Sequence, residues 1–164
     1  MLRTGRLVLA PWEFSDWLAF RPIATDPEVM RYITGGIPWT EEQIQSWVLR
    51  QMKCYVDKGF CRWKIAEPSS GDLIGFCGPG MWRDEPNPEI GWWLARSYWG
   101  RGLAPEAGRA ALDDAFHRAG HTRIISVAMP ENTASIAIMK KLGLQFDTRF
   151  ESDGLSLVRY SIKS

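Results

Sequence analysis

The sequence predicts a mixed α/β domain built on a mostly antiparallel sheet that contains one parallel pair of strands. Alternating apolar residues indicate strands at about 89–95 and 123–128, and a helix is expected between them, from about Gly102 to Ala119. Two strands of one sheet that are joined through a helix run parallel. Near the C-terminus, the pair Asp153-Gly154 favours an antiparallel hairpin.

Helix caps and apolar periodicity place the remaining elements. Asp26, followed by proline, and the capping box of Thr40 with Gln43 predict the starts of two helices, and Gly59 ends the second. Further strands are expected at 6–11, 60–66, 73–82, 144–150 and 155–162. These elements predict a sheet of six to seven strands flanked by helices, in a single domain that spans residues 1–164.

Composition narrows the class of protein. The 164 residues are 45% apolar and 24% charged, with a formal net charge of +1, which argues against a broad basic surface for nucleic acid. The sequence contains no stretch of about 18 consecutive apolar residues, so no membrane-spanning helix is expected. The three cysteines form no CxxC motif, so we expect free thiols and a cytoplasmic location.

The most informative segment is Glu89–Ala107, which is expected to form a strand, a glycine-rich turn and a helix N-terminus. Such a turn aims several backbone N–H groups at one point, and the helix dipole adds positive potential there. Gly100 and Gly102 remove side chains that would block a phosphate, and Arg101 adds a cation. The segment therefore predicts an anion-binding site.

Three phosphate-binding motifs compete for this turn. The P-loop pattern GxxxxGK[ST] is absent, and the dinucleotide pattern GxGxxG fails because Pro105 replaces its third glycine. The pyrophosphate turn of the GNAT enzymes, [QR]xxGx[GA], matches at Gly102 and Ala104 and departs at Trp99.

Four segments in order resemble the RimJ/RimL-like branch of the GNAT superfamily. They are Thr4–Trp12, Glu89–Leu94, the run Tyr98–Ala107 and the helix segment Pro130–Phe146. The resemblance implies acetyl-CoA as the co-substrate and a V-shaped gap between the strands at 89–95 and 123–128 that holds the pantetheine. It also implies transfer of the acetyl group to a primary amine, on a protein N-terminus or a small molecule, by direct attack in a ternary complex. The enzyme would be a monomer or a homodimer.

The resemblance also implies roles for residues. The pyrophosphate would be held by the backbone N–H groups of Gly100, Arg101, Gly102, Leu103 and Ala104. Leu94 and Arg96 would supply backbone bonds to the pantetheine and acetyl end, and a fixed donor at Leu94 could stabilise the oxyanion.

On the following helix, the resemblance implies that Asn132 binds the pantetheine and that Ser135 lies near the sulfur. Many GNAT enzymes carry a tyrosine proton donor on this helix, but Met139 occupies the corresponding position here. Ser135 is therefore the candidate proton donor. Asn132 could instead be a simple N-cap.

Glu89 is the first candidate for the general base, because it begins the central strand and could face the acceptor. The alternative is a solvated carboxylate at a strand end. An α-amine, with a pKa near 7.8, needs less help from a base than a lysine amine. Glu106, in the first turn of its helix, is expected to be structural. The acceptor pocket is expected to be lined by Trp39, Trp82 and Trp93, and the alternative for each of them is a place in the core.

Two other interpretations of the sequence are a metal site and a non-catalytic function. His117 and His121 have the spacing of a metal pair, but no third ligand is evident, so no metal is expected. The missing tyrosine leaves room for a non-catalytic acyl-CoA sensor or a partner-binding module, a hypothesis from a different class.

Overall fold

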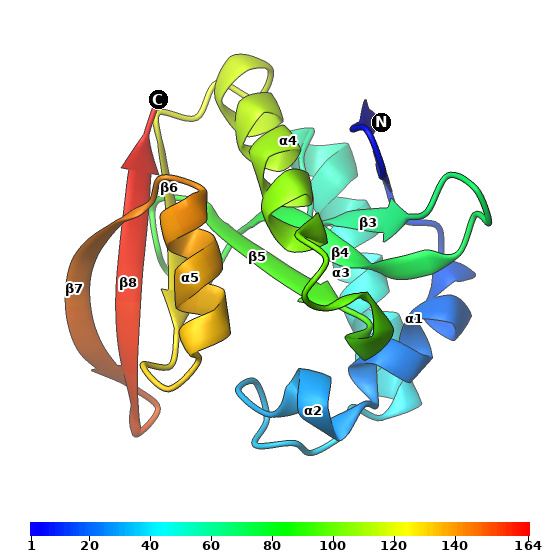
Figure 1. The fold of residues 1–164 in the computed structure, drawn as a ribbon, viewed down its shortest axis with the longest axis horizontal. Helices are drawn as coiled ribbons and strands as arrows, with labels where there is room; N and C mark the ends of the chain where they lie inside the picture. Colours follow the sequence, from blue (N-terminus) through cyan, green and yellow to red (C-terminus); the bar gives the residue numbers. More distant parts are fainter.

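One eight-stranded sheet runs through the computed structural model, which describes all 164 residues. Its strand order is β1-β2-β3-β4-β5-β6-β8-β7 (Figure 1). The strands are β1 (Leu2–Arg3), β2 (Val8–Ala10), β3 (Trp63–Ala66), β4 (Leu73–Gly80), β5 (Glu89–Leu94), β6 (Arg123–Ala128), β7 (Gln145–Ser152) and β8 (Leu155–Lys163). All neighbours are antiparallel except β5 and β6, which are parallel as expected.

Five α-helices and one short 3-10 helix complete the fold. They are α1 (Asp16–Ala24), α2 (Pro27–Met30), α3 (Glu41–Lys58), η1 (Arg96–Tyr98), α4 (Leu103–His117) and α5 (Thr133–Lys141). The expected starts of α2 and α3 are confirmed. The Asp26 side chain accepts a hydrogen bond from the backbone N–H of Glu28, and Thr40 and Gln43 make a complete capping box. Gly59 ends α3 in the left-handed conformation, with φ of 73°.

The parallel strands β5 and β6 meet at only one end. Glu89 and Ile125 are the single pair in register, and Figure 1 shows the two strands diverging toward their carboxyl ends. Beyond that pair, the carbonyl of Ile90 accepts a hydrogen bond of 2.9 Å from the buried hydroxyl of Ser126. This carbonyl is therefore satisfied without a backbone donor from β6, at the point where the strands separate.

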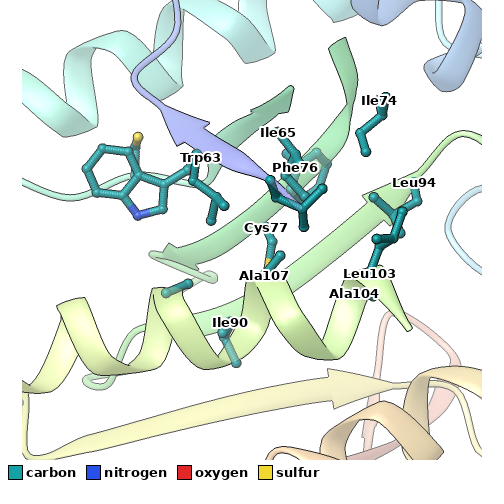
Figure 2. Close-up of a cluster of buried hydrophobic side chains, with 14 of the residues drawn as sticks. Trp63, Ile65, Ile74, Phe76, Cys77, Ile90, Leu94, Leu103, Ala104 and Ala107 are labelled. Atoms are coloured by element: carbon teal, nitrogen blue, oxygen red, sulfur yellow. The ribbon is translucent and has the colours of Figure 1, made fainter. Parts of the chain in front are cut away.

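Small side chains let α4 lie close to the sheet. Ala107, Ala111 and Ala115 are fully buried, and Figure 2 shows Ala107 facing β4 and β5. A side-chain carbon added at Gly108 would lie 2.7 Å from Leu142, so α4 also approaches the end of α5 closely. The small residues of α4 thus fix its position, and with it the position of its N-terminus.

The opposite face of the sheet packs against α1 and α3 through aromatic side chains. The ring of Phe20 on α1 lies 5.1 Å from that of Trp47 on α3 and 6.0 Å from that of Trp93 on β5. Trp12 packs edge-on against the rings of both Phe20 and Trp47. Phe76 on β4 completes this aromatic contact between the helices and the sheet, with its ring 4.8 Å from that of Trp47.

The sequence prediction of fold class is confirmed, with one difference in strand number. The sheet has eight strands because Leu2–Arg3 pairs with β2 as an additional edge strand. A two-residue segment carries too little periodicity to be recognised from sequence. None of the helices combines the length and the apolar character that crossing a membrane requires.

Candidate active site

A tight turn joins β5 to α4 and carries the residues expected to bind an anion. After β5 and η1, both Gly100 and Gly102 adopt left-handed backbone conformations, with φ of 71° and 72°. Gly102 is also the N-cap of α4. A side chain is strained in this conformation, so the turn depends on both glycines.

Five consecutive backbone amides in this turn have no acceptor within the protein. The N–H groups of residues 100–104 make no backbone or side-chain hydrogen bond, and the next residue, Pro105, has no N–H to satisfy. The following amide, that of Glu106, already bonds to the carbonyl of Gly102. The unpaired amides coincide with the positive end of the α4 dipole, an arrangement suited to a diphosphate.

Charged side chains surround the turn. The guanidinium of Arg101 stacks over the ring of Tyr98, 5.1 Å from its centroid. Glu106 is bound by Thr4 and by Arg6, which agrees with the structural role expected for it. Burial raises the pKa of the Glu106 carboxyl, but hydrogen bonds from Thr4 and Arg6 outweigh it, so this pKa lies below its ordinary value.

Leu94 and Arg96 lie between the gap and the turn. The carbonyl of Leu94 accepts a hydrogen bond of 2.9 Å from the indole N–H of Trp99, which ties the end of β5 to the turn. Arg96 forms an ion pair of 3.4 Å with Asp26, the N-cap of α2. The region that precedes α3 is thereby connected to the expected cofactor site.

The first turn of α5 holds the expected pantetheine and sulfur contacts. Asn132 is the N-cap, and its side-chain oxygen accepts a hydrogen bond of 3.2 Å from the amide of Ser135. Its amide nitrogen has no partner within the protein and can still donate to a ligand. The hydroxyl of half-buried Ser135 also makes no hydrogen bond within the protein. Met139 is almost fully buried in the core.

Glu89 is buried, and its carboxylate forms an ion pair with Arg62. The side chains of Arg62 and Glu89 are only 15% and 8% exposed. The guanidinium also lies 5.8 Å from the ring centroid of Phe76. Glu89 is therefore not the solvated strand-end carboxylate of the alternative interpretation, and its use as a base stays a prediction.

Only two of the three tryptophans expected at the acceptor pocket lie together. The rings of Trp39 and Trp93 are 4.9 Å apart, and both contact the core around Trp47. Trp82 packs instead against Phe150 on β7, with ring centroids 6.0 Å apart. The loop after β4 is bound to the β7–β8 hairpin, so Trp82 does not lie beside Trp39 and Trp93, and its place in the acceptor pocket stays a prediction.

Comparison with known proteins identifies the family. Residues 6–145 match the family model described as an acetyltransferase (GNAT) domain. The chain belongs to the GNAT acetyltransferase family. This N-acetyltransferase is 31% identical to an uncharacterized N-acetyltransferase, YnaD, of Bacillus subtilis, over 92% of this chain and 85% of the relative. It is 30% identical to an FsC-acetyl coenzyme A-N(2)-transacetylase of Aspergillus fumigatus, over 98% of this chain and 75% of the relative.

Solved structures show the same fold. A GNAT-family acetyltransferase from Bacillus anthracis superimposes with a TM-score of 0.84 at 28% identity, covering 99% of this chain and 97% of the other. RimL, a ribosomal L7/L12 α-N-protein acetyltransferase in complex with coenzyme A, gives a TM-score of 0.80 at 15% identity, covering 98% and 95%. The second likeness concerns the fold alone.

The two histidines of the N-acetyltransferase do not form a cluster suited to a metal. His117 contacts the carboxylate of Asp113 at 3.1 Å, whereas His121 packs edge-on against Phe60. No group of three or more histidine, cysteine, aspartate or glutamate side chains is arranged to hold a metal ion.

Sequence reasoning missed two residues of the site region, Arg62 and Ser126. Arg62 lies across Gly80 and Gly91, where an added side-chain carbon would come within 2.8 Å and 2.0 Å of its side chain. Gly91 pairs with Gly78 on the adjacent strand, and Gly80 lies two residues further along β4, so this group of glycines was the available signal that a large side chain crosses there. Ser126 gives no signal in the sequence, because its role depends on where β5 and β6 separate.

Proposed function

We propose that this GNAT N-acetyltransferase binds acetyl-CoA at the turn before α4 and transfers its acetyl group to a primary amine. The observation that carries the proposal is the run of five unpaired amides at residues 100–104, beside strands that share a single pair in register. Backbone donors at a helix N-terminus suit a pyrophosphate. Where β5 and β6 diverge, the backbone groups of Trp92 and the backbone N–H of Leu94 have no strand partner on that side and can bond to pantetheine, whereas the Leu94 carbonyl is already bonded to Trp99.

The transfer proceeds by direct attack in a ternary complex. The amine nitrogen forms a bond to the thioester carbonyl carbon, and the carbon–sulfur bond breaks as the tetrahedral intermediate collapses. We assign the Leu94 backbone N–H to the oxyanion and the Ser135 hydroxyl to protonation of the leaving thiolate. The proton lost by the amine goes to Glu89 or to a water chain.

The acceptor is proposed as a protein N-terminus or a small-molecule amine, in keeping with a place in the RimJ/RimL-like branch. Trp39 and Trp93, whose rings lie together, and the more distant Trp82 are the candidates for the wall of the acceptor pocket. The name of the Aspergillus relative describes transfer from acetyl coenzyme A to a nitrogen atom, which supports this reaction class. We further propose a monomer or homodimer in the cytoplasm, where the three free cysteines would stay reduced.

Calorimetry with acetyl-CoA tests binding, and release of free thiol over a panel of amines and N-terminal peptides tests transfer. We expect saturable binding and thiol release with at least one acceptor. Absence of binding at millimolar acetyl-CoA would refute the proposed co-substrate. Binding without release on any acceptor would favour the non-catalytic acyl-CoA sensor instead.

A further inference from the structure

We infer that Arg6, at the N-terminal edge of the sheet, is a positioning residue for the anion-binding turn and neutralises the one carboxylate beside it. This inference rests on the proposed function, because the anion is the diphosphate of acetyl-CoA. Arg6 lies 95 residues from Arg101 along the chain and reaches the turn only through the fold.

The guanidinium of Arg6 bonds to both sides of the turn. One nitrogen, Nη1, donates to the carbonyl of Arg101 at 2.9 Å, while Nε and Nη2 contact Glu106 Oε2 at 2.7 Å and 2.6 Å. The same carboxylate accepts from the backbone N–H of Arg6 at 3.0 Å and from the Thr4 hydroxyl at 2.5 Å. Glu106 is therefore held through both oxygens.

The bond to Arg101 orients the turn. Arg101 lies between the two left-handed glycines, and its carbonyl belongs to the same peptide unit as the unpaired N–H of Gly102. Fixing the carbonyl fixes the direction of that N–H, because the peptide unit is planar. A carbon added at Gly102 would be 3.7 Å from Nη2 of Arg6, so the guanidinium borders the site itself.

The charge of Arg6 matters as much as its hydrogen bonds. A carboxylate in the first turn of a helix stabilises the helix, but it repels an anion bound at the same N-terminus. With Arg6 in place, Arg6, Arg101 and Glu106 carry a net charge of +1; without Arg6, the charges of Arg101 and Glu106 cancel. Arg6 thus lets Glu106 anchor α4 without repelling the diphosphate.

The test compares coenzyme A with a donor that lacks phosphates. We expect Arg6→Met to weaken coenzyme A binding in calorimetry about tenfold, in line with a charge at a helix terminus. Turnover with acetyl-pantetheine should stay within about twofold of the wild-type kcat/KM, since that donor has no diphosphate to repel. Arg3→Met is the matched control, because Arg3 is an exposed arginine on β1 without a bond to the turn. We expect the Arg3→Met variant to bind coenzyme A with wild-type affinity.

Two further variants separate charge from folding. In the double variant Arg6→Met with Glu106→Gln, removal of the carboxylate should restore affinity to within about threefold of the wild type. Glu106→Gln alone should bind coenzyme A at least as tightly as the wild type, and this holds as a test even if Arg6→Met does not fold.

Three results would overturn the inference. They are unchanged coenzyme A affinity in Arg6→Met, an equal loss with both donors, and no recovery in the double variant. Absence of coenzyme A binding by the wild-type protein would instead refute the proposed function.

Discussion

Gly91 is the position where a single added methyl group should separate the buried ion pair of Arg62 and Glu89. The carbon that Gly91→Ala adds would lie 2.0 Å from Nη1 of Arg62 and 3.2 Å from its Cζ, so the guanidinium must move. Gly91 does not have a positive φ, so alanine suits the backbone and the effect is steric.

The cost follows from the burial of the pair. Removing one partner of a buried ion pair costs about 3–5 kcal/mol, because the other charge stays buried without compensation. A displaced Arg62 can keep part of the interaction, so we expect a loss of about 3 kcal/mol at the lower end of that range. For a domain of this size, the loss lowers Tm by about 6–12 °C.

Thermal and urea unfolding of matched variants measure this effect. In the background Arg62→Ala with Glu89→Gln, no guanidinium opposes the methyl group, and Gly91→Ala should cost less than about 1 kcal/mol. Gly5→Ala is the control in the native background, because no atom lies within 4 Å of its added carbon. A cost for Gly91→Ala that is the same in both backgrounds, or below about 1 kcal/mol in the native one, would refute the reasoning.

Other predictions concern catalysis, the strand gap and pH. Ser135→Ala should lower kcat much more than acetyl-CoA affinity, and unchanged turnover would remove Ser135 from the mechanism. Ser126→Ala should leave the carbonyl of Ile90 without its donor and lower the free energy of unfolding by about 1–3 kcal/mol in urea titrations; an effect within about 0.5 kcal/mol would contradict this. The pKa of Glu106 is lower in the folded protein, so its carboxylate stabilises the fold at pH values above its ordinary pKa of 4.5. This contribution disappears as the pH falls through the lowered pKa. The stability difference between the wild type and Glu106→Gln should therefore be constant near pH 7 and shrink below pH 4.5, and a constant difference down to pH 3 would contradict the assignment.

Features set by neighbouring residues could be predicted from the sequence. The capping box at Thr40 depends on residues three apart, and the turn around Gly100 and Gly102 depends on local backbone freedom. The role of Asn132 as an N-cap was likewise predictable from its position before α5. Because its oxygen caps the helix and its nitrogen stays free, this role is compatible with the proposed contact to pantetheine. The order of strands and helices followed from periodicity, except for the two-residue strand β1.

The tertiary structure alone decided which distant charges meet. Arg62 reaches Glu89 across 27 positions of the chain, and Arg6 reaches Glu106 across 100. It also decided that Trp82 packs against the C-terminal hairpin rather than beside Trp93. Apolar periodicity fixes the face on which a residue lies, but the partner of a polar side chain depends on strand order, register and helix position. Those are properties of the packed chain as a whole, and short sequence patterns do not record them.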